Sequence, residues 1–394
     1  MNLKFLYFLF FLSSSSSITF KGHLKSLEYF PFNFLEYIQI NICLDERTTQ
    51  CFNLILDLND INIILFSNEI TKYGYKSINQ KSNSSQSLYD KKINKNNITF
   101  IGKETNNIYQ IERNDIPFFF ILINECTIDL NKYQFSGFFG LSLKKENKEI
   151  NSLIQSLKNK NLISKKNIEI KFKSESNIQF ILDSNSNNKM YKFCALTFSQ
   201  NINGNYLLSC TLNSLIFSKN KTIINTYFLI DVAFDSFNEI IQAPEPMGYD
   251  LFKIYMEESK EKCIIKYDNI YNGHYIECDS NFDLFNLSTI SLNMSNIEIE
   301  LNIEDIFDLK SKKSKIYIIK YSNMWVLNVN ILKHYNLFID YDNYLIGFEK
   351  NNINFRKKKF YIYIFYLNIL CIIILLLGLF LNIIIYLSIK KNII

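Results

Sequence analysis

Between residues 36 and 350 the chain alternates between short runs rich in Ile, Phe, Tyr and Val and polar stretches rich in Asn, Ser and Lys. Within the runs, apolar residues recur with a period of two, which is typical of β-strands. The polar stretches, such as 76–95 and 184–189, are typical of loops. The runs that predict strands are 36–43, 51–58, 61–66, 117–123, 168–172, 178–182, 226–234, 297–303 and 314–321.

Helical periodicity is confined to two places in this region. Residues 149–162 carry apolar side chains at helical spacing, and a shorter helix is expected over 329–335. Domains average about 100–200 residues, so a region of this length predicts two lobes. The Ser- and Asn-rich stretch 184–188 is the expected boundary. The pattern therefore predicts a mostly β, bilobal body, with lobes at 36–183 and 190–350 and a short N-terminal segment at 18–35.

The two ends of the chain have a different pattern. Residues 1–17 combine one Lys, a short apolar core and a run of Ser, which predicts a secretory signal peptide. Residues 360–389 contain no charged residue and exceed the ~20 residues that a membrane-spanning helix requires. A basic stalk, 351–359, precedes this predicted helix, and a short tail, 390–394, follows it. We expect a single-pass type I protein of a secretory-pathway membrane or the cell surface, although the basic stalk on the lumenal side opposes the positive-inside rule.

Composition excludes several classes of function. The net charge of +5 comes from scattered basic residues, so nucleic acid is not an expected partner. No C-x-x-C motif occurs and the 3 His residues are dispersed, so neither a metal site nor a cofactor is expected. The 10 Gly residues form no phosphate-binding loop, and no G-x-S-x-G motif points to a serine hydrolase.

An oxidising compartment would pair the cysteines of the predicted body. The short-range pairs Cys43–Cys51, Cys194–Cys210 and Cys263–Cys278 could each close a β-hairpin, which leaves Cys126 over. Sequons for N-glycosylation are present at Asn83, Asn97, Asn220, Asn286 and Asn293.

Two aspartates end apolar runs, one in each predicted lobe. Asp57 ends the run 51–58 and precedes another apolar run, and Asp235 follows the run 226–234 and precedes Ser236. Two carboxylates that share one proton can act as acid and base, because like charges about 3 Å apart cannot both ionise. This pair is the candidate catalytic dyad.

At these positions the chain resembles the pepsin-like aspartic proteases. The first family motif, Q-x-F-x-V-x-x-D-T-G, aligns with Gln50, Phe52, Leu54 and Asp57. The second, D-T-G-T-S-x-x-x-x-P, aligns with Asp235, Ser236 and Pro244. Residues 136–141 are similar to D-G-I-L-G-L, and residues 325–348 are similar to the C-terminal W-x-L-G-D-x-F-L and Y-x-x-F-D motifs. The resemblance implies a bilobal acid-protease fold that binds peptide or protein ligands in a cleft.

The departures from the family motifs are at the positions expected to take part in catalysis. Asn59 and Phe237 replace the Gly of the two D-T/S-G triplets, Leu58 replaces a Thr, and Asn328 replaces a third Gly. In the family these glycines allow tight turns, and the hydroxyls tie the two loops together. Tyr89 is the candidate for the flap Tyr, from its position alone.

These departures favour a catalytically impaired, peptide-binding pseudoprotease, since a displacement of about 1 Å is enough to disable a site. One alternative is an active aspartic endopeptidase that uses Asp57 and Asp235 to activate water. Another is a surface adhesion or structural β-protein, in which the two aspartates would lie far apart.

Overall fold

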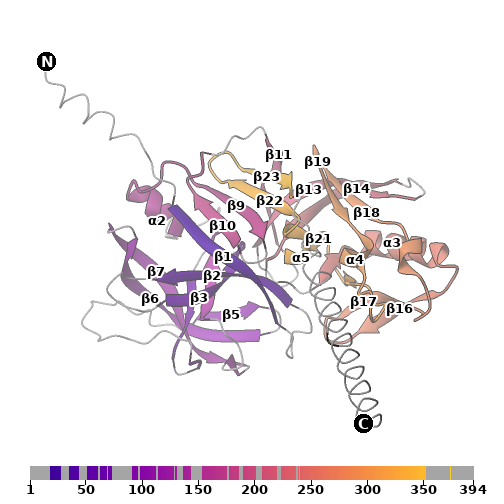
Figure 1. Ribbon diagram of the computed structural model, residues 1–394, viewed down its shortest axis with the longest axis horizontal. Helices are drawn as coiled ribbons and strands as arrows, with labels where there is room; N and C mark the ends of the chain where they lie inside the picture. The colour runs from indigo at the N-terminus through magenta and orange to yellow at the C-terminus, as the bar shows by residue number, and fades with distance from the viewer. Residues whose placement is uncertain are drawn as a thin grey trace, which may run out of the picture. The chain divides into compact units, whose positions relative to one another are not determined.

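The computed structural model describes residues 18–27, 35–43, 51–60, 63–68, 70–72, 91–95, 98–111, 114–127, 129–130, 136–142, 153–174, 177–185, 190–200, 206–219, 223–236, 238, 240–351 and 373 (Figure 1). In these residues the strands form one sheet of 13 strands, called here the first sheet, and one of 10, the second sheet. All nine predicted strand runs contain a strand, so the expectation of a mostly β fold is confirmed.

The first sheet is built largely from the N-terminal half of the chain. Its strands, in spatial order, are β11 (Lys192–Ala195), β23 (Leu345–Lys350), β22 (Tyr335–Asp340), β9 (Asn167–Ser174), β10 (Asn177–Leu182), β1 (Ile18–Leu27), β2 (Leu35–Cys43), β3 (Cys51–Asp57), β8 (Gly137–Gly140), β4 (Ile63–Phe66), β7 (Asn114–Cys126), β6 (Ile98–Ile111) and β5 (Lys91–Lys95).

The second sheet comes entirely from the C-terminal half. Its order is β16 (Cys263–Asp268), β17 (Gly273–Cys278), β20 (Ile316–Ile319), β15 (Ile241–Ala243), β21 (Met324–Leu327), β14 (Ile223–Phe234), β13 (Tyr206–Phe217), β18 (Ile290–Met294) and β19 (Ile297–Leu301), with β12 (Thr197–Gln200) paired to β13. The described helices are α2 (Leu153–Asn159), α3 (Glu245–Glu258), α4 (Ile303–Ile306), α5 (Val329–Leu332) and the 3₁₀ turn η3 (Leu284–Asn286).

Three features of the fold differ from the sequence-based expectation: the first strand, one helix and the boundary between the sheets. The sequence predicts a first strand near Tyr37, but β1 begins earlier, at Ile18, and pairs with both β2 and β10. Helix α3 is not predicted, although Pro244 at its N-cap and the buried Met247, Leu251 and Tyr255 have the start signal and spacing of a helix. The predicted boundary at 184–188 also does not separate the sheets, because β11, β22 and β23 lie beyond it in sequence and belong to the first sheet.

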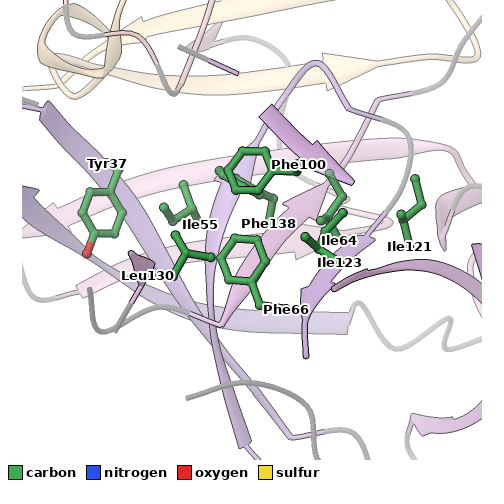
Figure 2. Close-up of a cluster of buried hydrophobic side chains, with 9 residues drawn as sticks. All are labelled: Tyr37, Ile55, Ile64, Phe66, Phe100, Ile121, Ile123, Leu130 and Phe138. Carbon is green, nitrogen blue, oxygen red and sulfur yellow. The ribbon is translucent and has the colours of Figure 1, made fainter. Parts of the chain in front are cut away.

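A cluster of buried apolar side chains packs against β3, β4 and β8 near the end of β3. It contains Tyr37, Ile55, Ile64, Phe66, Phe100, Ile121, Ile123, Leu130 and Phe138 (Figure 2). The rings of Phe66 and Phe100 stack with centroids 5.5 Å apart, and Phe138 meets both edge-on. Such a cluster holds β8 in register beside β3, and β3 is the strand that ends at Asp57.

Among the described residues, Cys194–Cys210 and Cys263–Cys278 are disulfide-bonded, as the cysteine spacing predicts. For the third predicted pair the structure gives the strand register only: Cys43 lies directly opposite Cys51 where β2 pairs with β3. The half-buried Cys126 packs against the apolar cluster of the first sheet.

The predicted signal peptide, most of the basic stalk and the tail lie outside the described residues, as does the predicted membrane segment apart from Ile373. Across the ranges that are described, no helix has the length and apolarity needed to cross a bilayer.

A buried carboxylate lies in the first sheet, where β9 pairs with β22. Glu169 is 1% exposed and accepts hydrogen bonds from Ser184 Oγ (2.6 Å) and Tyr191 OH (2.7 Å), with Lys171 Nζ at 2.8 Å. Burial alone would raise the pKa of Glu169, but these partners outweigh it, and the pKa lies below its usual value of 4.5. The ionised form is therefore the one that stabilises the fold.

A Glu169→Gln variant should be less stable than the wild type at pH 7 by about 1.5–3 kcal/mol, the usual contribution of a hydrogen bond to a charged group. Because the pKa is depressed in the folded state, wild-type Glu169 contributes this stability above pH 4.5 and loses it as the pH falls through the folded pKa. The difference in unfolding free energy between wild type and Glu169→Gln, measured by urea unfolding, should be smaller at pH 3.5 than at pH 7. Glu300→Gln, at an exposed ion pair with Lys350, is the control, and an equal gap at both pH values would contradict the prediction.

Candidate active site

The same arrangement of four strands occurs once in each sheet. In the first sheet β3 runs parallel to β8, β8 antiparallel to β4, and β4 parallel to β7. In the second sheet β14 runs parallel to β21, β21 antiparallel to β15, and β15 parallel to β20. The strands β3 and β14 are therefore equivalent members of a repeated unit, although the sequence shows this only in fragments.

Asp57 and Asp235 occupy the equivalent ends of these two strands. Asp57 is the last residue of β3 and lies opposite Gly140 of β8, and its carbonyl accepts a hydrogen bond from Leu141 N–H (3.0 Å). Asp235 directly follows β14, and its N–H donates to Leu327 O at the end of β21 (2.9 Å). The structure thus gives both predicted dyad residues the same local setting.

Hydrogen bonds join the residues that follow the two aspartates. Leu58 N–H donates to Ser236 Oγ (3.2 Å), and Ser236 Oγ donates to Leu56 O (2.9 Å). Both Leu58 and Ser236 are buried, at 1% and 0% exposure. A buried hydroxyl that is bonded on both sides fixes the spacing of the two loops. The loops that carry Asp57 and Asp235 therefore lie next to each other.

The side chain of Asn59 makes two further long-range hydrogen bonds. Its Nδ2 donates to Phe234 O (2.8 Å), and its Oδ1 accepts from Leu208 N–H (2.9 Å). Sequence reasoning treats Asn59 only as a lost glycine and misses these contacts. The amide of Asn signals a donor and an acceptor at this position, but only the folded chain shows which main-chain groups it reaches.

The carboxylate of Asp57 is buried, at 4% exposure, and its orientation is set by the main chain. Its Oδ1 accepts hydrogen bonds from Asn59 N–H (2.9 Å) and Asp60 N–H (3.1 Å). Asp235 is half-buried. Asp60 is a second carboxylate in the loop of Asp57, and the comparison of motifs does not identify it.

Two of the three lost glycines cause no strain in the backbone. Asn328, the N-cap of α5, is extended with φ −94° and ψ 178°, which any residue adopts. Non-glycine residues with positive φ occur elsewhere in the described chain, at nine positions from Asn161 to Tyr344, and Asn59 is not among them. Neither Asn59 nor Asn328 therefore adopts a backbone conformation that favours glycine. Phe237, the third position, lies outside the described residues.

The structure describes only some of the other predicted site residues. Tyr89 and the sequons at Asn83, Asn97 and Asn220 lie outside the described residues. Asn286, in η3, is exposed, and Asn293 lies half-buried in β18 between β13 and β19. Trp325 is fully buried in β21, where Nε1 donates to Met247 Sδ (3.3 Å), so its ring is part of the core.

No family model matches the sequence, and no curated protein does. Among solved structures, the chain is similar to the aspartic proteinase from Irpex lacteus with a TM-score of 0.61 and 13% identity, over 86% of this chain and 98% of that one. At this identity the likeness concerns the fold. Together with the strand arrangement repeated at Asp57 and Asp235, it shows that the chain has the pepsin-like fold of aspartic proteinases.

Proposed function

We propose that this protein binds peptides or protein segments at a pepsin-like site formed around Asp57 and Asp235, and that it hydrolyses them poorly. The observation that carries the proposal is the hydrogen-bonded link between the two aspartate loops, from Leu58 N–H through Ser236 Oγ to Leu56 O. Such a link supports a pair of carboxylates that both reach one bound ligand. The fold of a solved aspartic proteinase supports the same assignment.

The proposed impairment rests on Phe237, which stands two residues after Asp235 where the related motif has Gly. A phenyl ring has far more bulk than a glycine, and the attacking water and peptide carbonyl need positions accurate to about 1 Å. Asn59 and Asn328 do not contribute, since their backbones are unstrained.

A second candidate function, an active aspartic endopeptidase, is favoured by the intact link between the loops. In that case one aspartate would act as general base toward water, and the other would donate a proton to the carbonyl oxygen. Asp57, with its carboxylate oriented by Asn59 N–H and Asp60 N–H, has the fixed geometry that either role requires.

The proposal also places the site at a membrane, on the lumenal or extracellular side. The uncharged segment 360–389 supports an anchor, and residues 1–17 support entry into the secretory pathway. The disulfides Cys194–Cys210 and Cys263–Cys278 suit an oxidising compartment. Peptide segments of secreted or membrane-bound proteins are the ligands expected there.

The test is hydrolysis of a peptide library at acid pH by the full chain in detergent. Wild type should cleave slowly, and Phe237→Gly should raise the rate, by up to about 100-fold if the ring displaces the reacting groups. Phe237→Leu, which keeps a bulky side chain, is the matched control and should stay slow. Rapid cleavage by wild type, unchanged in Phe237→Gly, would instead establish the endopeptidase.

A further inference from the structure

The hydrogen bonds around Ser236 are one half of a two-fold pattern. Ser236 follows Asp235, and its hydroxyl donates to Leu56 O, the carbonyl of the residue before Asp57. Because β3 and β14 are equivalent strands, the position equivalent to Ser236 is Leu58. A hydroxyl at position 58 would donate to the carbonyl of the residue before Asp235, which is Phe234. Leucine cannot do so.

Asn59, one residue later, makes the bond that Leu58 cannot. Its Nδ2 lies 2.8 Å from Phe234 O, the acceptor that the two-fold pattern assigns to position 58. Its Oδ1 accepts from Leu208 N–H at 2.9 Å, and Leu208 is the direct partner of Phe234 in the β13–β14 ladder. The amide therefore binds the ends of two paired strands, immediately before Asp235.

The surroundings make this bond matter more than a surface contact would. Phe234 is fully buried, at 0% exposure, and Leu58 is at 1%. A carbonyl that loses its donor in such a place is left with a desolvation penalty that water does not relieve. The half-buried Asn59 also holds Asp57, because its N–H donates to Asp57 Oδ1. One residue thus contacts both aspartate loops.

We propose that Asn59 is a positioning residue that replaces the missing hydroxyl of position 58, so that Leu58 and Asn59 together form a relocated link between the two loops. It sets the position of Asp235 relative to Asp57, and in its effect on ligand binding the inference rests on the function proposed above. Compared with the related motif, Asn59 in place of Gly and Leu58 in place of Thr are then one compensated pair.

The experiment is a double-mutant cycle in the full chain with Asn59→Ala, Leu58→Thr and the double variant. The probe is a peptide that carries a hydroxyl in place of the scissile carbonyl. Asn59→Ala removes both hydrogen bonds of the amide, and the loss of the one to Phe234 O, next to Asp235, should weaken the binding of this probe about tenfold, equivalent to 1.4 kcal/mol. In the Leu58→Thr background the same change should have little effect, because the new hydroxyl supplies the bond to Phe234 O.

Asn336→Ala is the matched control. The Asn336 amide also bridges two partners, donating to Glu349 Oε2 (2.9 Å) and accepting from Phe172 N–H (3.0 Å), but all three residues lie in the first sheet. Its loss should reduce thermal stability without changing ligand affinity. Equal losses of affinity in Asn336→Ala and Asn59→Ala, or an Asn59→Ala loss that persists in the Leu58→Thr background, would overturn the inference.

Hydrogen–deuterium exchange separates this inference from the proposed function, since it needs no ligand. In Asn59→Ala, exchange should rise about tenfold at Leu208 N–H, because this group loses its acceptor. Exchange should rise by a similar factor at Leu58 N–H, because its hydrogen bond to Ser236 Oγ persists only if the two loops stay together. If exchange is faster at both sites but wild type does not bind the peptide, Asn59 links the two loops and the proposed peptide-binding function is wrong. Unchanged exchange at Leu58 would reject the link.

Discussion

Replacing Asp57 by Asn is expected to weaken the binding of a hydroxyl-containing peptide mimic by about 10- to 100-fold, the usual loss for a hydrogen bond to a charged group. The Asn side chain has the same shape, and its Oδ1 can still accept from Asn59 N–H and Asp60 N–H. The loop should therefore keep its position while the charge is lost. Any hydrolysis at acid pH should fall by about 10²–10⁴-fold, the range for general acid–base catalysis. Isothermal titration calorimetry and a peptide cleavage assay measure the two effects.

Asp235→Asn should have the same effects as Asp57→Asn, since a dyad fails when either member is lost. Asp231→Asn is the matched control, because Asp231 lies in β14, four residues before Asp235. Its carboxylate accepts from Ser199 Oγ and Thr211 Oγ1 and takes no part in the proposed site. A mimic that binds equally well to wild type, Asp57→Asn and Asp235→Asn would show that these residues do not form the binding site.

Gly137→Ala is expected to prevent stable folding of the first sheet, with a loss of more than about 3 kcal/mol. Gly137 has φ +152°, a backbone conformation that side chains strongly disfavour, and an added Cβ would lie 1.9 Å from Ile64 O. That carbonyl belongs to β4, which pairs with β8, so no side-chain rotation relieves the clash. The neighbouring Phe138 would leave the apolar cluster shown in Figure 2.

Urea unfolding of the full chain measures this loss, and Gly248→Ala in α3 is the control. At Gly248 an added Cβ would meet Ile318 Cγ1 at 2.7 Å and Ala243 Cβ at 3.2 Å, which are side-chain atoms and not a main-chain carbonyl. Its effect should be smaller than that of Gly137→Ala, since a side chain can shift and alanine is the better helix former. A Gly137→Ala protein as stable as Gly248→Ala would mean that β8 does not pass this close to β4.

The short strands could be predicted because the pattern that identifies each one lies within a few consecutive residues. Runs such as 178–182 and 297–303 alternate with a period of two, and the alternation alone identifies them. Strand β1 escaped prediction because it directly follows the Ser run of the predicted signal peptide and has Gly22 where the alternation would place an apolar residue. Helix α3 escaped prediction because a stretch beginning with Pro244 and Pro246 resembles a loop as much as a helix start.

The aspartates could be found from sequence because motifs keep their order along the chain. The contacts that set their geometry could not, because they are long-range. Asn59 reaches Phe234 and Leu208, which lie far along the sequence, and its amide has no preferred partner until the strands have paired. The backbone angle of Asn328 was likewise decided by the fold, which made a glycine unnecessary. Substitution within a motif therefore says less about a site than the bonds that the substituted residue makes.

A crystal structure of the full chain with the hydroxyl-containing peptide mimic bound would show whether Asp57 and Asp235 act on one ligand. The hydroxyl of the mimic should lie within about 3.2 Å of a carboxylate oxygen from each aspartate, the range of a hydrogen bond. A mimic bound elsewhere, or carboxylates too far apart to contact one hydroxyl, would show that the two aspartates do not form one site.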